Sequence, residues 1–263
     1  MTEDAGGRSD LHPGRLLRGL ASGGLVRSVV LFDMVDSTNR AAMRAARAGS
    51  AGGLLCVAEH QTAGRGRAGR RWSSSPGKGL LFSLLLDPTR EAESLTQLLA
   101  VASVRALDPL CEGVRVKWPN DIYIGSEKAA GILAETREAR VVLGMGLNVN
   151  EERADFPPVL AERATSMRIV SGRSHSRGAV LIALIQELAE CYELWRGSGL
   201  EPFVVELERR MLFLGERVEL RSGNERFAGI MRGITGEGLL RLDIDGEEHV
   251  FPSGDLSLRR RPG

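Results

Sequence analysis

Residues 61–78 have the sequence QTAGRGRAGRRWSSSPGK, which contains four glycines, four arginines and one lysine but no acidic residue. Arginine guanidinium groups bind carboxylates and phosphates through paired hydrogen bonds. Glycines let backbone N–H groups come close to the same anion. We call residues 61–78 the basic loop, and their composition predicts an anion-binding segment. On this segment alone, a flexible surface loop that contacts nucleic acid is an equally good interpretation.

A second cluster of polar residues lies at positions 117–121, where the sequence is KWPND, and Lys128 follows within KAAG. Taken alone, an aromatic residue, a proline and an Asn-Asp pair are typical of a turn. The lysines are nevertheless informative, because only three of the 35 basic residues are lysine: Lys78, Lys117 and Lys128. In a chain that otherwise uses arginine, a lysine indicates a position that needs a compact ammonium group.

Residues 36–39 (DSTN) precede the alanine-rich run RAAMRAARAG. All four are residues that commonly cap a helix N-terminus, so the pattern predicts a helix that begins here and ends near Gly49. One helix needs only one cap. The remaining polar groups of Ser37, Thr38 and Asn39 suit a small polar ligand, although a cap without a ligand explains the pattern as well.

These polar residues must be positioned by the elements around them. Apolar runs at residues 54–60 and 80–86 predict two buried strands that anchor the two ends of the basic loop. The same patterns predict further strands at residues 29–32, 114–117, 122–124, 128–135 and 141–149, and helices at residues 91–110, 179–195 and 201–212. From residue 215 onward, alternating segments with Gly-rich turns predict a small antiparallel barrel of about 45 residues.

Composition narrows the function classes. Of the 263 residues, 43% are hydrophobic and 26% are charged, as in an ordinary globular protein. The net charge of +1 gives no general attraction to nucleic acid or membranes. The three cysteines follow no metal or disulfide pattern, and no apolar run is long enough to span a membrane. The first 24 residues lack the apolar core of a secretory signal, so we expect a cytoplasmic protein.

Taken in order, the motifs resemble those of the biotin protein ligases. The matching segments are DSTN at 36–39, QTAGRGRAGR at 61–70, KWPND at 117–121, KAAGIL at 128–133 and GLN at 146–148. Each motif is weakly specific by itself, whereas the ordered set is specific. The resemblance extends from about residue 29 to about residue 260.

The resemblance implies an α+β fold. Its catalytic domain is like that of class II aminoacyl-tRNA synthetases, with a mixed β-sheet and flanking helices, and a small SH3-like β-barrel follows at the C-terminus. We expect a flexible extension over residues 1–26 with one short helix near residues 16–21, a catalytic domain that binds biotin and ATP over residues 27–212, and the barrel over residues 213–263. So short an extension implies a form without the N-terminal winged-helix repressor domain that some family members carry.

The resemblance also implies a reaction. Biotin is activated with ATP to biotinyl-5′-AMP and pyrophosphate, and is then transferred to a lysine of a biotin carboxyl carrier protein. We therefore expect ATP, Mg²⁺ and biotin as small-molecule participants, and the carrier domain of a biotin-dependent carboxylase as the partner. No DNA or membrane partner is expected, and the protein is expected to be a monomer or a homodimer.

By the same resemblance, individual residues receive expected roles. The residues expected to bind biotin are Ser37, Thr38, Asn39, Gln61, Gly64, Arg65, Gly66, Arg67, Lys128 and Gly131. Those expected to bind the nucleotide are Arg65, Arg67, Arg70, Trp72, Lys117, Asn120 and Asn148. Catalysis is expected to depend on Lys128, Arg65, Arg67 and Arg70, with Asp121 as a metal ligand. A catalytic lysine can exchange its proton, which an arginine cannot do.

Two other functions stay open. A lipoate or octanoate ligase shares the fold and the adenylation chemistry, although GRGRAGR together with KWPND favours biotin. A nucleic-acid-binding protein would use the basic loop without ATP, and the near-neutral net charge disfavours it.

Overall fold

The computed structural model describes residues 10–21, 24–88, 94–137, 139–222, 225–252 and 256–260. Across these ranges the strands are β1 (Ser28–Val35), β2 (Leu54–Gln61), β3 (Leu80–Leu86), β4 (Val114–Lys117), β5 (Asp121–Ile124), β6 (Glu127–Arg137), β7 (Arg140–Leu147), β8 (Arg217–Ser222), β9 (Glu225–Ile234), β10 (Leu240–Ile244), β11 (Glu247–Phe251) and β12 (Leu256–Arg260). The helices are α1 (Pro13–Leu20), α2 (Thr38–Arg47), α3 (Leu95–Leu107), α4 (Met167–Ser171), α5 (Arg177–Ser198) and α6 (Val204–Arg210), with short 3-10 turns η2 (Arg67–Gly69), η3 (Arg153–Asp155) and η4 (Glu201–Phe203).

The larger sheet has seven strands in the order β1-β2-β3-β7-β6-β5-β4. β1 and β2 are parallel, and the other neighbours are antiparallel. β3 and β4 have the predicted bounds, because each is a run of apolar or alternating residues that ends at a turn. Since β2 and β3 pair directly, the basic loop connects two neighbouring strands, and the sheet fixes both of its ends as predicted.

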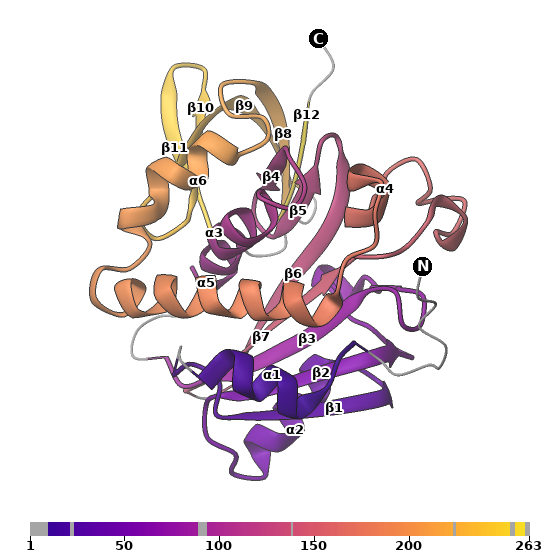
Figure 1. Ribbon diagram of the computed structural model, residues 1–263. Coiled ribbons are helices and arrows are strands. Elements are labelled where there is room, and N and C mark those ends of the chain that lie inside the picture. Colours follow the sequence, from indigo (N-terminus) through magenta and orange to yellow (C-terminus); the bar gives the residue numbers. More distant parts are fainter. Residues whose placement is uncertain are drawn as a thin grey trace.

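Helices cover both faces of this sheet (Figure 1). Successive residues of a strand point to opposite faces. Leu55 and Val57 of β2 therefore belong to the main core beneath α3 and α5, whereas Leu54 and Cys56 pack in a smaller cluster with Ala42 of α2. The polar residues at the start of α2 are thus held against the sheet from the face opposite to α3 and α5.

The segment before β1 is packed onto the rest of the molecule. Leu11, Leu16 and Leu20 are only 1–2% exposed, and α1 contacts α5 and β1. A Cβ atom on Gly19 would lie 2.5 Å from a side-chain carbon of Ile182, so glycine allows close helix packing here. The flexible extension expected over residues 1–26 is therefore wrong for residues 10–20, whereas the short helix expected within it is present as α1, which begins three residues earlier than predicted. Residues 1–9, 22 and 23 of that extension lie outside the described ranges.

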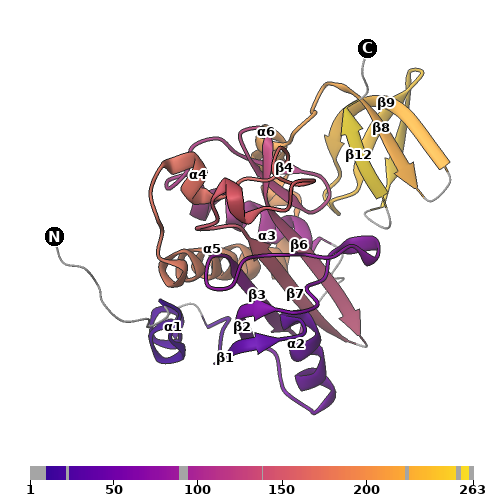
Figure 2. The same cartoon turned by 90° about the vertical axis from the view of Figure 1, so that its right-hand side faces the viewer.

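The smaller sheet has five strands in the order β11-β10-β9-β8-β12, all antiparallel, as the alternating pattern after residue 215 predicted. It stands at one end of the molecule, beyond β4 and α6 (Figure 2). The buried Trp118 joins it to the larger sheet, because its Nε1 donates a hydrogen bond to the Gly238 carbonyl at 3.0 Å. Among the described residues, no helix is long and apolar enough to cross a membrane.

Candidate ligand-binding site

A cavity of about 350 Å³ lies between the basic loop, β4 to β6 and residues 148–164. The basic loop is the purple connection that crosses β6 and β7 in Figure 2. The predicted site residues that line the cavity are Arg65, Gly66, Arg67, Arg70, Trp72, Lys117, Asn120, Asp121, Lys128, Gly131 and Asn148. The other predicted residues, Ser37, Thr38, Asn39, Gln61 and Gly64, are not among its lining residues and form a second cluster beside it.

Positive side chains dominate the cavity wall. They are Arg65, Arg67, Arg70, Arg71, Lys117, Lys128 and Arg163, against the acidic Asp121, Glu151 and Asp155. Several are held by protein acceptors: Arg65 Nη1 lies 2.7 Å from Glu135 Oε1, and Lys128 Nζ lies 2.7 Å from Asp121 Oδ1. The cavity therefore attracts anions and already orients the groups that would bind them.

Lys117 lies in an unfavourable place for a charged ammonium group. Burial lowers its pKa, and repulsion from Lys128 adds to this effect, while Asp121 acts in the opposite direction. Its Nζ is 5.6 Å from the ring centre of Tyr123 and 5.7 Å from that of Phe213. Burial also raises the pKa of Tyr123 to about 12, so this phenol stays neutral. An anion that entered the cavity would stabilise the charged form of Lys117 and so offset the cost of burying it.

The indole ring of Trp72 lies against two glycines of the sheet. Gly131 of β6 and Gly146 of β7 are directly paired, and together they leave room for the indole ring. A Cβ atom would come within 2.4 Å of Trp72 Nε1 at Gly146 and within 3.3 Å of Trp72 Cζ3 at Gly131. The indole Nε1 is buried and has no hydrogen-bond partner. Lys128 Nζ lies 5.7 Å from the ring centre, so the indole and this cation share one part of the cavity.

The cluster beside the cavity is a chain of hydrogen bonds at the start of α2. Gln61 Oε1 accepts from the backbone N–H of Thr38 at 2.7 Å and from its hydroxyl at 3.1 Å. The buried Ser83 hydroxyl lies 2.7 Å from Thr38 Oγ1 and 2.6 Å from Asn39 Oδ1. α2 begins at Thr38 as the pattern predicted, yet the Ser37 side chain makes no capping hydrogen bond. The Ser37 hydroxyl therefore does not cap the helix.

Asn39 is bound on both sides of its amide. Its Nδ2 donates to Glu135 Oε2 at 2.9 Å and to the Leu133 carbonyl at 3.4 Å, while Oδ1 faces Ser83. These contacts tie α2 to β6 and β3. The Asn39 side chain therefore supports the other residues of the cluster. A ligand that bound to it would have to replace one of these hydrogen bonds.

Residues 148–160 form the far side of the cavity. Asn148 Nδ2 donates to the Thr165 carbonyl at 2.9 Å, whereas Oδ1 is buried without a hydrogen-bond partner. Glu151 is 1% exposed, and its Oε1 accepts from the Ser74 hydroxyl at 2.6 Å. Burial raises the pKa of Glu151, and the Ser74 hydrogen bond partly offsets this. Three apolar side chains, Phe156, Pro157 and Leu160, complete this side.

Lys78, the lysine at the end of the basic loop, is paired with a residue of the cavity wall. Its Nζ lies 2.6 Å and 2.8 Å from the two oxygens of Asp155. The pKa of Asp155 is lowered chiefly by this contact. The end of the basic loop is therefore tied to the far side of the cavity through an ion pair.

Sequence reasoning missed Ser74, Ser83, Glu135 and Glu151. A signal existed for Ser83, because it is the single polar residue in the apolar run LLFSLLL of β3. A buried hydroxyl needs a partner, so its presence there indicates a polar contact in the core. The other three gain their partners only from the folded arrangement, and no local pattern marks them.

Comparison with known proteins shows the family to which the chain is related. Residues 31–150 match the biotin/lipoate A/B protein ligase family, and residues 213–259 match the biotin protein ligase C terminal domain. The chain is 34% identical over 251 residues to the bifunctional ligase/repressor BirA of Bacillus spizizenii, covering 91% of this chain and 77% of that protein. It is 33% identical over 242 residues to the biotin–[acetyl-CoA-carboxylase] ligase of Mycobacterium tuberculosis, covering 88% of each. The structure of biotin protein ligase from Aquifex aeolicus in complex with biotin and ATP matches with a TM-score of 0.80 and 31% identity, over 89% of this chain and 99% of that one.

Proposed function

Because the chain belongs to the biotin protein ligases, we propose that the cavity is the place where it activates biotin with ATP and from which it transfers the biotinyl group to a carrier lysine. The enzyme is thus an ATP-dependent biotin–protein ligase. The observation that carries the site assignment is the cavity wall, where the basic loop places Arg65, Arg67 and Arg70 together with Lys117 and Lys128.

The first step brings two anions together. A carboxylate oxygen of biotin attacks the α-phosphorus of ATP, a new P–O bond forms, and pyrophosphate leaves. Arg65, Arg67 and Arg70 are suited to hold the carboxylate and the phosphates, because guanidinium forks stabilise the charge that develops around phosphorus. Asn120 supports this role, since its Oδ1 accepts from Arg67 at 3.2 Å while its Nδ2 donates to the Ile132 carbonyl at 2.8 Å.

The polar head of biotin is a ureido group with one carbonyl and two N–H groups. Ser37, Thr38 and Gln61 offer hydroxyl and amide partners of both kinds, and the backbone at Gly64 and Gly66 follows shortly after Gln61 in the sequence. The apolar tail of biotin would then run toward the cations over the sheet. The indole of Trp72 occupies the seat formed by Gly131 and Gly146, so we expect it to move when biotin binds.

The adenosine part of ATP fits the far side of the cavity. Asn148 Oδ1 has no hydrogen-bond partner, and an exocyclic amino group of adenine could donate to it. Trp72, once it leaves its seat, provides a flat surface for stacking on the base. Lys117 is placed for the phosphates, because its buried ammonium group gains an opposite charge there.

The second step moves the acyl group. The amine of the carrier lysine attacks the carbonyl carbon of biotinyl-5′-AMP, the bond to the phosphate oxygen breaks, and AMP leaves. Lys128 is oriented by Asp121 at 2.7 Å and lies beside the proposed path of the biotin tail. We assign it to the mixed anhydride linkage, where an ammonium group stabilises the carboxylate in the first step and the departing phosphate in the second.

Magnesium fits the site only together with ATP. In the described part of the chain, no group of three or more His, Cys, Asp or Glu side chains could hold a metal ion. Mg²⁺ that accompanies a nucleotide usually takes one or two carboxylates and completes its shell with phosphate oxygens and water. Asp121 is the carboxylate that we propose for it, and the ion would supply positive charge to the phosphates.

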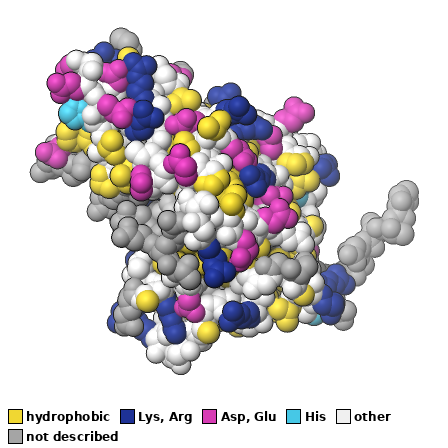
Figure 3. Space-filling model, turned by 90° about the vertical axis from the view of Figure 1, so that its left-hand side faces the viewer, with side chains coloured by type: hydrophobic (Ala, Val, Ile, Leu, Met, Phe, Trp, Pro, Cys, Tyr) yellow, Lys and Arg dark blue, Asp and Glu magenta, His cyan; other side chains and the backbone are white. Residues whose placement is uncertain are grey.

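Several broader expectations accompany this assignment. We propose a catalytic domain over residues 27–212 of the class II aminoacyl-tRNA synthetase type, and an SH3-like barrel over residues 213–263. The partner is the carrier domain of a biotin-dependent carboxylase, and the protein acts in the cytoplasm as a monomer or homodimer. We also expect no DNA partner; on the face shown in Figure 3, basic and acidic side chains are interspersed.

Pyrophosphate release from ATP tests the assignment, with biotin, lipoate or octanoate offered separately. Wild type should release pyrophosphate with biotin alone. Lys128→Ala should slow this strongly, Lys128→Arg should restore only part of it, and Arg232→Ala, in an exposed ion pair of β9, should behave as wild type. Release with lipoate or octanoate would overturn the choice of substrate, and no release with any of the three acids would overturn the ligase assignment.

A further inference from the structure

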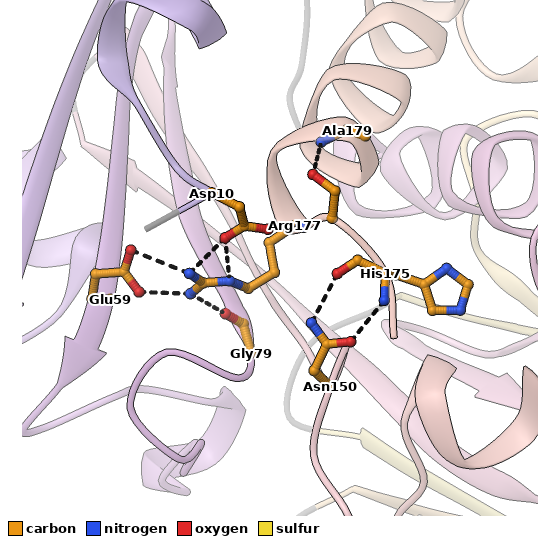
Figure 4. A network of polar contacts seen from close by, with 8 residues as sticks. Asp10, Glu59, Gly79, Asn150, His175, Arg177 and Ala179 are labelled. Carbon is orange, nitrogen blue, oxygen red and sulfur yellow. Dashed lines mark hydrogen bonds and ion pairs between the residues drawn. The ribbon is translucent and has the colours of Figure 1, made fainter. Parts of the chain in front are cut away.

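Arg177, the first residue of α5, carries a guanidinium group that is buried from solvent, with the residue only 4% exposed. Its Nη1 donates to Glu59 Oε2 at 2.6 Å and lies 3.4 Å from the Gly79 carbonyl. Its Nε donates to Asp10 Oδ1 at 2.9 Å, and the Arg177 backbone N–H donates to Asp10 Oδ2. Figure 4 shows this guanidinium between Glu59 and Asp10, with the Gly79 carbonyl below it.

The partners of Arg177 include both flanks of the basic loop. Glu59 lies on β2, two residues before Gln61, and its carbonyl accepts from the Gly77 N–H at 3.3 Å. Gly79 is the residue that enters β3. One guanidinium therefore holds the strand that leads into the loop and the residue at which the loop ends.

The segment just before Arg177 holds the loop end a second time. Asn150 exchanges two hydrogen bonds with the backbone of His175, at 2.8 Å and 2.9 Å, as Figure 4 shows. The Asn150 N–H also donates to the Lys78 carbonyl at 3.0 Å. The start of α5 is thus the common attachment for residues 78 and 79 and for the strand that carries Glu59.

Asp10 adds the N-terminal segment to this attachment. A guanidinium removed from water must be paired, and its planar fork can serve several oxygens at once. At the start of α5 the Ser176 hydroxyl accepts from the Ala179 N–H at 3.3 Å, and Asp10 accepts from the Arg177 N–H. Asp10 therefore binds both the backbone and the guanidinium of Arg177, and through the guanidinium it is connected to the loop flanks.

We propose that Asp10 and Arg177 are positioning residues of the reaction, which hold the two flanks of the basic loop at the separation from which the loop can order over biotin and ATP. The proposal rests on the function assigned above to the basic loop. It gives Asp10 a part in ligand binding, although Asp10 does not line the cavity.

The test compares Asp10→Ala with Glu206→Ala. Glu206 forms an equally direct ion pair with Arg105, at 2.6 Å and 2.9 Å, between α6 and α3 and away from the loop. The Asp10 and Glu206 side chains are similarly exposed, at 34% and 36%, so both variants should fold. Asp10→Glu serves as the conservative variant that can still reach Arg177.

Two measurements are made on the full chain: the KM for biotin in pyrophosphate release, and amide exchange of residues 62–78 with biotin and ATP present. Asp10→Ala should raise this KM about three- to tenfold and speed exchange in the loop. Asp10→Glu should recover most of both, and Glu206→Ala should lower Tm without changing either. Equal effects of the two alanine variants, or an unchanged loop in Asp10→Ala, would show a structural role only. Failure of the ligase assignment is recognised separately, because wild type would then release no pyrophosphate.

Discussion

Ser83→Ala isolates the polar cluster at the start of α2. The Ser83 side chain is fully buried, and its hydroxyl lies 2.7 Å from Thr38 Oγ1 and 2.6 Å from Asn39 Oδ1. Alanine keeps the Cβ atom, so the variant removes the hydroxyl and leaves almost no cavity. Thr38 retains its bonds to Gln61, but Asn39 Oδ1 loses the partner that the hydroxyl provided.

The size of the effect follows from this loss. A buried acceptor left without a partner costs about 1–3 kcal/mol of the free energy of unfolding. For a chain of this size, Tm falls by about 2–4 °C for each kcal/mol. The variant also removes the contact of Ser83 with the Thr38 hydroxyl. Because Thr38 is proposed to contact the biotin head, about 1 kcal/mol of the loss should appear as a fivefold higher KM for biotin. The KM for ATP should change much less.

Ser103→Ala is the matched control. Ser103 is also fully buried, and its hydroxyl donates to the Leu99 carbonyl within α3 at 2.6 Å. That carbonyl keeps its helical partner in the variant, so the cost should stay below about 1 kcal/mol, with no change in either KM. Thermal unfolding and steady-state pyrophosphate release measure both quantities. Equal losses of Tm in the two variants, or equal increases in the KM for biotin and ATP in Ser83→Ala, would refute the reasoning.

Three further predictions concern single contacts. Gly146→Ala places a Cβ atom 2.4 Å from Trp72 Nε1, so the indole should leave its seat. Trp118 and Trp195 are at most 1% exposed, so a change in tryptophan emission would come from Trp72. The emission of the unliganded variant should shift to the red as the indole becomes exposed. An unchanged spectrum would contradict the position of the indole against Gly146. Burial raises the pKa of Glu151, so the stability that Glu151 contributes is present below its ordinary pKa of 4.5 and is lost as pH rises through the higher pKa of the folded state. Glu151→Gln cannot ionise, and its Tm relative to wild type should increase as pH rises from about 4 to about 8; a constant difference would count against the raised pKa. Trp118→Phe removes the donor to the Gly238 carbonyl and should cost about 1 kcal/mol in unfolding by denaturant, whereas no loss would mean that this bond does not help join the sheets.

The fold could be predicted where a local pattern sets the structure. β3 has the predicted bounds because Leu80–Leu86 is a continuous apolar run, and five of the strands after residue 215 follow from alternation. The short helix of the N-terminal segment could be predicted, but its packing onto the rest of the molecule could not, because its Gly- and Arg-rich composition is typical of a flexible chain. Leu11, Leu16 and Leu20 become a core face only when α5 is present beside them, and sequence spacing does not reveal that neighbour.

Residues that line the cavity could be predicted where their type is unusual for their part of the sequence. The arginines and glycines of the basic loop, and the rare lysines at 117 and 128, stand out from the rest of the chain, and all of the predicted cations line the cavity. Arg177 has no such signal, since it is one arginine among many. Its role depends on Glu59 and Asp10, which lie 118 and 167 residues away along the chain.

The arrangement of charges explains how a cavity rich in cations can exist before an anion enters it. Arg65 and Lys128 are already paired with Glu135 and Asp121, at side-chain exposures of 41% and 31%. Ion pairs this exposed contribute about 0–1 kcal/mol each, so a phosphate or carboxylate oxygen can replace the acidic partner at little cost. The Arg177 side chain is only 5% exposed, and its pairs cannot be exchanged in this way without leaving a buried charge. Arg65 and Lys128, which line the cavity, are therefore held by partners that can be displaced, while Arg177, which contacts the loop flanks, is held by partners that stay.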